Sequence, residues 1–346
     1  MVSVIASPGA LLSGTSDRTR AKDAHGGLLR RIGDRGLLVV KDLTTILNMD
    51  KTSRATIVSA LREIYDGKWS REIGTDGGRT LEWRGRIVVV GATTTEWDTA
   101  HEVVAACGDR FLLVRIDTTL GRRAAFDQAW ENLGHEVQMR RELTEAVGQL
   151  LTAVNTEPIL HFTDQDKTDL FDLSNFLTWA RSSVRRDYRD DVISPHSPEQ
   201  PPRVGKQLLQ LLRGACALGM SLDLAMALAA RCAHDSINPT RLAMLLDLEQ
   251  HPKSSIAQVA KRVSLPYMTV KRTLEGLWTL ELVSRDEVPG ATTPYGEYEY
   301  ALTSRVKPSI LHKFHITQNR EPCDDSGEDP TITKNTKPLR HSDVPF

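Results

Sequence analysis

Two apolar runs, separated by a helical pattern, constrain the fold of this chain more than any other feature. Leu37–Val40 and Ile87–Val90 are continuous aliphatic runs bounded by glycine and polar residues, a pattern typical of strands buried on both faces. Thr52–Tyr65 lies between them with apolar residues at helical spacing, and Asp50 is placed to cap its first turn. Two buried strands joined by a helix predict a parallel sheet in an α/β domain.

Polar residues follow both predicted strands at their carboxyl ends. Asp42 comes after the first strand, and Thr93 and Thr94 come after the second. Open α/β sheets bind ligands at the carboxyl ends of their strands, so these three side chains are candidates for a ligand site. A carboxylate there can hold Mg²⁺ or polarise water beside a phosphate, and a threonine can hydrogen-bond that phosphate. The plain alternative is a core strand that is followed by an acidic residue.

Further elements are expected around these strands. Lys68–Arg84 predicts a β-hairpin, because a turn rich in glycine separates two segments that each contain a tryptophan. Strands are also expected at Ala10–Ser13 and Arg110–Ile116, and helices at Leu28–Ile32 and Trp97–Ala106.

From residue 122 to residue 235 the apolar residues follow helical spacing. Four prolines between Ser194 and Pro202 predict an extended linker, and Asn238 followed by proline is a start signal for another helix. The polar sequence near the end cannot bury enough apolar surface to offset the entropy of ordering. We therefore expect an α/β region at 1–120, a helical region at 121–235, a third domain at 236–305 and a disordered tail at 306–346.

The composition is that of an ordinary globular protein, with 346 residues, 40% hydrophobic and 26% charged, and a formal net charge of −1. This charge neither favours nor excludes nucleic acid, because a local patch can still be basic. No apolar run is long enough to cross a bilayer. The four cysteines are scattered without a Cys-x-x-Cys pair, as expected for reduced thiols. We expect a cytoplasmic protein with no membrane contact and no metal site.

A predicted helix pair lies near the end of the chain. Ser255–Val263 and Pro266–Leu282 each carry an apolar stripe and are joined by only Ser264 and Leu265. Two predicted strands, Val283–Arg285 and Glu297–Leu302, follow them. This order resembles the winged helix-turn-helix of bacterial regulators such as the MarR and ArsR families.

The resemblance implies that the second helix enters the major groove of DNA. Side chains off the apolar stripe would contact bases or phosphates: Tyr267, Thr269, Lys271, Arg272, Lys261 and Arg262, with Lys253 nearby. The alternative is a module used only for packing. The expected wing, residues 286–299, favours that alternative because it contains no lysine or arginine to contact phosphates.

The order of elements in the first 120 residues also carries a resemblance. The predicted elements are, in order, a strand followed by an acidic residue, a helix, a hairpin, a strand followed by threonine, a helix, and a strand that begins with Arg-Phe. This order resembles the AAA+ ATPase core. It resembles in particular the branch with a hairpin before the sensor-1 strand, which includes the minichromosome-maintenance helicases. The resemblance implies a Walker B strand ending at Asp42 and a sensor-1 residue at Thr93 or Thr94. It also implies an arginine finger at Arg110 and a sensor-2 arginine at Arg203.

In those helicases the hairpin projects into a central channel and touches DNA. Here Lys68, Arg71, Arg79 and Arg84 supply charge beside two tryptophans. The alternative is that the tryptophans only stabilise the hairpin as a cross-strand pair.

Two departures from the family weaken nucleotide binding. Lys41 stands where the family has the first acid of the Walker B pair, and a cation there repels Mg²⁺. The chain also lacks a Gly-x-x-x-x-Gly-Lys-[Ser/Thr] loop, whose backbone amides and lysine surround the phosphates. ATP and Mg²⁺ are therefore expected only if a P-loop is supplied from elsewhere, and the chain is expected to be an amino-terminally truncated or degenerate member.

The sequence thus predicts an α/β part followed by an all-α part: an incomplete parallel-sheet P-loop-type domain with a β-hairpin insertion, a helical lid and a C-terminal winged helix. The expected function is binding of double-stranded DNA in replication or transcription regulation, with self-association left open. The alternative is an active ATP-dependent DNA helicase or motor, whose P-loop lies in missing amino-terminal residues or in another chain.

Overall fold

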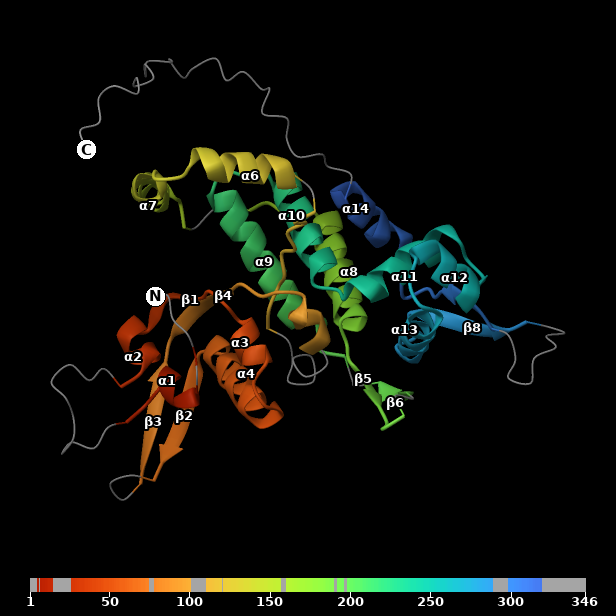
Figure 1. Ribbon diagram of the computed structural model, residues 1–346, viewed down its shortest axis with the longest axis horizontal. Coiled ribbons are helices and arrows are strands. Elements are labelled where there is room, and N and C mark those ends of the chain that lie inside the picture. The colour runs from red at the N-terminus through yellow and green to blue at the C-terminus, as the bar shows by residue number, and fades with distance from the viewer. Residues whose placement is uncertain are drawn as a thin grey trace, which may run out of the picture.

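The computed structural model describes residues 5, 7–14, 26–74, 78–100, 110–119, 121–156, 160–189, 192–195, 198–288 and 298–318. The fold is mixed α/β, with many helices and small sheets. Figure 1 shows the amino-terminal α/β part, in red and orange, beside a larger helical part in green and blue. Each part has its own hydrophobic core.

The predicted parallel strand pair is confirmed. β1 (Arg35–Val40) pairs in parallel with β4 (Arg86–Gly91). Helix α4 (Lys51–Tyr65) connects them through the hairpin, and the Asp50 carboxylate accepts hydrogen bonds from two amides of its first turn, at 3.1 and 3.0 Å. The short helices α1 (Pro8–Leu11), α2 (Leu28–Ile32) and α3 (Thr44–Leu47) complete this part.

The expectation that both faces of the sheet are buried is wrong. Leu38 and Val40 are fully buried against the amino-terminal core, whereas Leu37, Val88 and Val90 on the other face are each about half exposed. Paired residues of parallel strands share a face, and Leu37 lies opposite Val88. One apolar face of the sheet is therefore left open to solvent.

The predicted hairpin is also confirmed. β2 (Lys68–Ile73) pairs antiparallel with β3 (Arg79–Arg84), and Trp69 lies opposite Trp83. Both tryptophans are 6% exposed, and the Trp83 indole N–H donates to the Gly33 carbonyl at 2.9 Å. The two rings therefore pack into the amino-terminal core, as the stabilising alternative expects.

Two predicted strands do not form. Ala10–Ser13 is not a strand, because the chain there belongs mainly to helix α1. Arg110–Ile116 is not assigned as a strand, and it pairs with none of the strands in the described part of the chain. Instead, the Leu113 amide donates to the Ser236 hydroxyl at 2.8 Å and the Arg115 amide donates to the Asp235 carboxylate at 2.7 Å. Helical side chains, not a sheet, thus satisfy the backbone of this segment. The predicted helix Trp97–Ala106 is helical at residues 96–100, and residues 101–109 lie outside the described residues.

The helical region from residue 121 contains elements of very different burial. Its helices are α6 (Arg122–Glu131), α7 (Glu136–Ala153), α8 (Asp164–Ala180), α9 (Pro201–Ala217) and α10 (Leu222–Asp235). Helices α8 to α10 contribute to the larger core. A small hairpin that was not predicted, β5 (Val184–Arg186) with β6 (Val192–Pro195), lies between α8 and α9 and shortens the expected proline linker.

The last part of the chain follows the predicted order. Its elements are α11 (Pro239–Gln250), β7 (Ser254–Ser255), α12 (Ile256–Val263), α13 (Tyr267–Thr279), β8 (Val283–Glu287) and β9 (Tyr298–Leu302). The tail prediction is wrong for its first part, because Pro308–Gln318 forms helix α14. Ile310, Leu311 and Phe314 of α14 are buried in the larger core. The rest of the expected tail, from residue 319, lies outside the described residues.

Within the described part of the chain, no helix combines the length and hydropathy needed to cross a membrane.

Candidate nucleic-acid interface

Helices α12 and α13 form a tight helical pair. Ser255 begins α12 with a capping box, in which its side chain and that of Gln258 each bond the other's backbone amide. Ser264 ends the helix in the left-handed conformation, with φ 55°, and α13 begins three residues later, at Tyr267. This short reversal lets the apolar stripes of both helices face one core.

The inner face of the pair is fully buried, through Val259 of α12 and Val270, Leu274 and Leu277 of α13. Because an amphipathic helix buries one stripe and leaves the other in water, the opposite face of α13 is available to a partner.

The strands hold α13 in place from one side. β9 lies between β7 and β8 in a three-stranded antiparallel sheet. The Arg285 guanidinium of β8 lies 3.8 Å from the ring centroid of Trp278 and 4.5 Å from that of Tyr298, a stacked cation–π arrangement that links α13 to both strands. The predicted wing lies mostly outside the described residues, which resume at Tyr298.

Four predicted contact residues lie at or near the outer surface of the pair. Tyr267 is 52% exposed, and Arg272 and Lys261 are exposed. The Lys271 side chain is 43% exposed, and its ammonium lies 3.8 Å from the Glu275 carboxylate. Such an exposed pair is weak, so Lys271 can exchange this partner for a phosphate. Thr269 is half-buried beside them.

Arg262 is placed differently from the other predicted contacts. Its guanidinium donates to both carboxylate oxygens of Asp247 in α11, at 2.7 and 2.8 Å, and to the Ser254 hydroxyl at 2.8 Å. The hydrogen bond with Asp247 raises the pKa of Arg262 further above its ordinary value. A bidentate arginine–carboxylate pair is geometrically specific, so Arg262 mainly fixes α12 to α11.

The β5–β6 hairpin, which was not predicted from the sequence, packs beside α13. The Arg186 guanidinium donates to the Arg272 carbonyl at 2.8 Å, although 85 residues separate the two in the chain. Figure 1 shows this hairpin next to α13. Its Tyr188 is 86% exposed, and the Arg189 guanidinium lies 5.1 Å from that ring. The hairpin also contains aspartates, including Asp187, so it adds mixed charge to this surface.

The predicted nucleotide residues at the sheet edge do lie together. The Asp42 carboxylate accepts from the Thr44 amide at 2.9 Å, and the Thr44 hydroxyl accepts from the Thr94 amide at 3.3 Å. The Thr93 hydroxyl donates to the Thr94 carbonyl at 3.3 Å. These residues are exposed or half-buried, and the Asp42 carboxylate caps the start of α3.

The two predicted nucleotide arginines make contacts within the chain. The Arg110 side chain is only 9% exposed, lies 3.3 Å from the Asp66 carboxylate and sits 5.9 Å from the Tyr65 ring centroid. It therefore anchors the segment that starts at residue 110 to the end of α4. Arg203 pairs with Glu199 at 3.3 Å, and its side chain is 39% exposed. In the described residues no three His, Cys, Asp or Glu side chains form a group that could hold a metal ion.

Asp235 is the centre of a polar cluster that joins the two parts of the molecule. Its carboxylate is 1% exposed and accepts from the Arg115 amide at 2.7 Å and from Arg231 at 2.8 Å, with His234 at 2.8 Å. Arg115 in turn makes a bidentate pair with Asp98 of the amino-terminal part, at 2.8 and 2.7 Å. Burial alone would raise the pKa of Asp235, but these hydrogen bonds hold it below its ordinary value.

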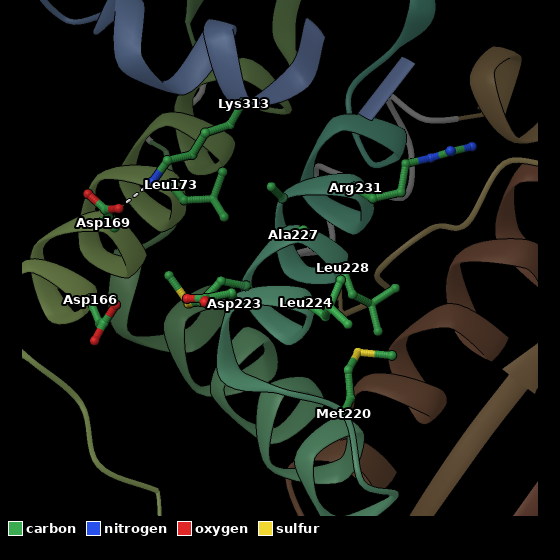
Figure 2. A pocket seen from close by; sticks show the side chains of 12 residues that line it. Asp166, Asp169, Leu173, Met220, Asp223, Leu224, Ala227, Leu228, Arg231 and Lys313 are labelled. Carbon is green, nitrogen blue, oxygen red and sulfur yellow. Dashed lines mark hydrogen bonds and ion pairs between the residues drawn. The ribbon is translucent and has the colours of Figure 1, made fainter. Parts of the chain in front are cut away.

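A pocket of about 530 Å³ lies between α8, α10 and α14. Figure 2 shows Lys313 reaching from α14 toward Asp169 of α8, with which it forms an ion pair. Asp166 and Asp223 add acidic groups, while the floor is largely aliphatic. Arg231 and Lys313 also line the pocket, so its charged groups are of both signs.

Comparison of the chain with protein-family models, with curated proteins and with solved structures gives no match.

Proposed function

We propose that the protein binds double-stranded DNA through the outer face of α13, in replication or transcription regulation. The observation that carries the proposal is the α11–β7–α12–α13–β8–β9 order, with the apolar stripe of α13 buried and Tyr267, Lys271 and Arg272 on or near its outer side. This arrangement resembles a winged helix-turn-helix, in which the second helix of the pair enters the major groove.

Charge determines how such a surface would bind. Lys271, Arg272 and Lys261 can each neutralise one phosphate, and phosphate contacts supply most of the non-specific affinity. Arg262 contributes less, because Asp247 already holds it. With only three such cations, binding should be modest, and its log–log salt slope should not exceed about 3 in magnitude.

The amino-terminal part is proposed to be a degenerate AAA+-like scaffold. Its parallel strand pair, hairpin and clustered Asp42, Thr44 and Thr94 support this proposal. The same cluster is the observation that favours the alternative, an ATP-driven motor completed by a P-loop from elsewhere. Isothermal titration with ATP and Mg²⁺ separates the two, since low-micromolar binding by this chain alone would favour the motor.

The DNA proposal is tested by a double variant, Lys271→Ala with Arg272→Ala. Fluorescence anisotropy with a labelled random duplex, measured over a series of salt concentrations, should show weaker binding and a log–log salt slope reduced by up to about 2. The matched control is Lys167→Ala with Lys206→Ala, which removes the same charge from exposed positions on α8 and α9. Equal affinities and slopes for native protein and the Lys271/Arg272 variant would contradict the proposal.

A further inference from the structure

Helices α6 and α7 bury none of their own residues. They comprise 10 and 18 residues, and Figure 1 shows them at the upper edge of the view, away from the labelled strands. An isolated helix shorter than about 12–15 residues is only marginally stable in water. Most helical stability in proteins comes from packing of an apolar face, so α6 in particular needs a covering surface that the described part of the chain does not provide.

The first exposed stripe consists of Phe126 and Trp130 on α6, Leu133 in the turn that follows and Val137 in the first turn of α7. All four side chains are 60 to 75% exposed, and Phe126 and Trp130, four residues apart, share one face of α6. The Phe126 and Trp130 rings are neighbours, with centroids 6.3 Å apart.

The second exposed stripe lies on α7. Leu143, Val147 and Leu150 recur at four and three residues, with Leu151 beside them, and all four are 49 to 66% exposed. Eight large apolar side chains at these exposures offer on the order of 800 Å² of apolar surface, about what one partner buries in a standard stable interface. Scattered exposed leucines need no explanation, but large apolar side chains that recur along one face of a helix, as on α7, favour an interaction surface.

The charges beside the stripes indicate what covers them. Helices α6 and α7 together carry four arginines and five acidic residues, so both signs are present in nearly equal numbers: Arg122, Arg123, Arg140 and Arg141, with Asp127, Glu131, Glu136, Glu142 and Glu145. A helix that lies on a membrane carries mostly lysine and arginine on its polar face, which these two helices do not. A partner with only one sign of charge would be attracted by some of these groups and repelled by others. A surface with both signs can complement itself when a second copy is turned about a two-fold axis.

We propose that α6 and α7 form the interface of a homodimer, in which the two apolar stripes of one copy pack against those of its partner. The interface is isologous, so each copy contributes the same side chains. This proposal is independent of whether the protein binds DNA.

The test measures the mass of the full chain in solution by light scattering and sedimentation at tens of micromolar. The native chain should have twice its chain mass of 38.5 kDa. Leu143→Glu with Leu150→Glu should be monomeric, with dimer affinity reduced by more than about 30-fold. Because neither leucine is buried within the chain, the variant should keep the circular dichroism spectrum of the folded monomer.

The matched control is Leu224→Glu, which places the same charge on a leucine that is 46% exposed at the pocket on α10. It should remain dimeric. If the native chain is monomeric, or if the Leu143/Leu150 variant stays dimeric, the proposal is overturned. If Leu224→Glu dissociates the dimer equally, the stripes pack into the pocket of the neighbour and not against themselves, which also overturns it.

A second variant keeps the test decisive if the double substitution unfolds α7. Val147→Cys should be captured as a covalent dimer by a long, flexible bismaleimide, because both copies of Val147 lie in the same proposed interface and within the span of such a reagent. The native chain, with its own cysteines, sets the background. Absence of crosslinking above that background would contradict the interface.

Discussion

Two consecutive sets of helices, α6–α7 and α8–α11, have similar amphipathic sequences but opposite burial. They are called below the exposed set and the buried set. Leu173, Leu208 and Leu245 of the buried set are buried to 3% exposure or less, whereas every leucine of α7 is about half exposed or more. Helical spacing predicted helices in both places correctly. Spacing therefore indicates which face of a helix is apolar, but not whether the same chain covers that face.

The largest loss in the free energy of unfolding is expected at the Asp235 cluster, which connects helix α10 to the amino-terminal part of the molecule. Asp235→Ala removes a carboxylate that is 1% exposed and leaves the amide of Arg115 without its acceptor. Breaking a buried, hydrogen-bonded charge pair should lower the free energy of unfolding by about 4 kcal/mol. Urea denaturation measures this loss, and Asp98→Ala, which keeps the Asp235 contacts, should cost less. A loss below that of Asp98→Ala would show that Asp235 is not the centre of the cluster.

The same cluster predicts acid sensitivity. Because the pKa of Asp235 is lowered in the folded state, its stabilising contribution is present above the unfolded carboxyl pKa and is lost as pH falls through the folded pKa. The difference in urea midpoint between native protein and Asp235→Asn should therefore shrink below about pH 4. Asp50, Asp166 and Asp169 also have lowered pKa values, so only this difference reports on Asp235.

A matched pair of leucines compares the buried set and the exposed set directly. Leu245→Ala in α11, where the side chain is fully buried, should lower the free energy of unfolding by about 3 kcal/mol through lost burial and a cavity. Leu150→Ala in α7 should change it by less than about 0.5 kcal/mol, when measured at a concentration low enough to keep the chain monomeric. Equal losses at both positions would mean that α7 is covered within the chain.

The smallest change in the free energy of unfolding is expected from substitutions at the N-cap residues of helices. Thr163 caps α8 with a reciprocal capping box, in which its hydroxyl accepts from the Asp166 amide at 3.1 Å, whereas His135 makes no side-chain cap to α7. Thr163→Ala should cost about 1 kcal/mol, and His135→Ala should cost almost nothing. Thermal unfolding of the two variants measures the difference, and indistinguishable melting temperatures would contradict it.

Local patterns in the sequence predicted much of the amino-terminal fold. β1, α4, the Asp50 cap, the tryptophan hairpin and β4 all follow from the run lengths, cap residues and turn residues near them. These signals work because a strand, a cap or a tight turn depends mainly on residues within a few positions of one another.

The predictions that failed depended on distant partners. Arg110–Ile116 has the apolar pattern of a strand, but its amides bond to Ser236 and Asp235, more than a hundred residues away. α14 was expected to be disordered because the tail around it is polar, yet Phe314 is buried between helices. Arg262 has the type and position of a phosphate contact, but Asp247 holds it.

The residues predicted to contact DNA show the same division between local and distant information. Periodicity alone placed Val270 and Leu274 inside and Tyr267 and Arg272 outside, and their burial agrees. Whether these side chains contact DNA stays a prediction.

The sequence by itself determined where many of the helices, strands and turns begin and which face of each is apolar, because those properties follow from neighbouring residues. Only the tertiary structure decided that the segment after residue 110 binds helices, that the β5–β6 hairpin lies against α13 and that no other described segment buries the residues of α6 and α7. The physical reason is that each segment can form hydrogen bonds and apolar contacts with many distant segments. Which of these contacts form depends on the free energy of the whole folded chain and not on the residues near the segment.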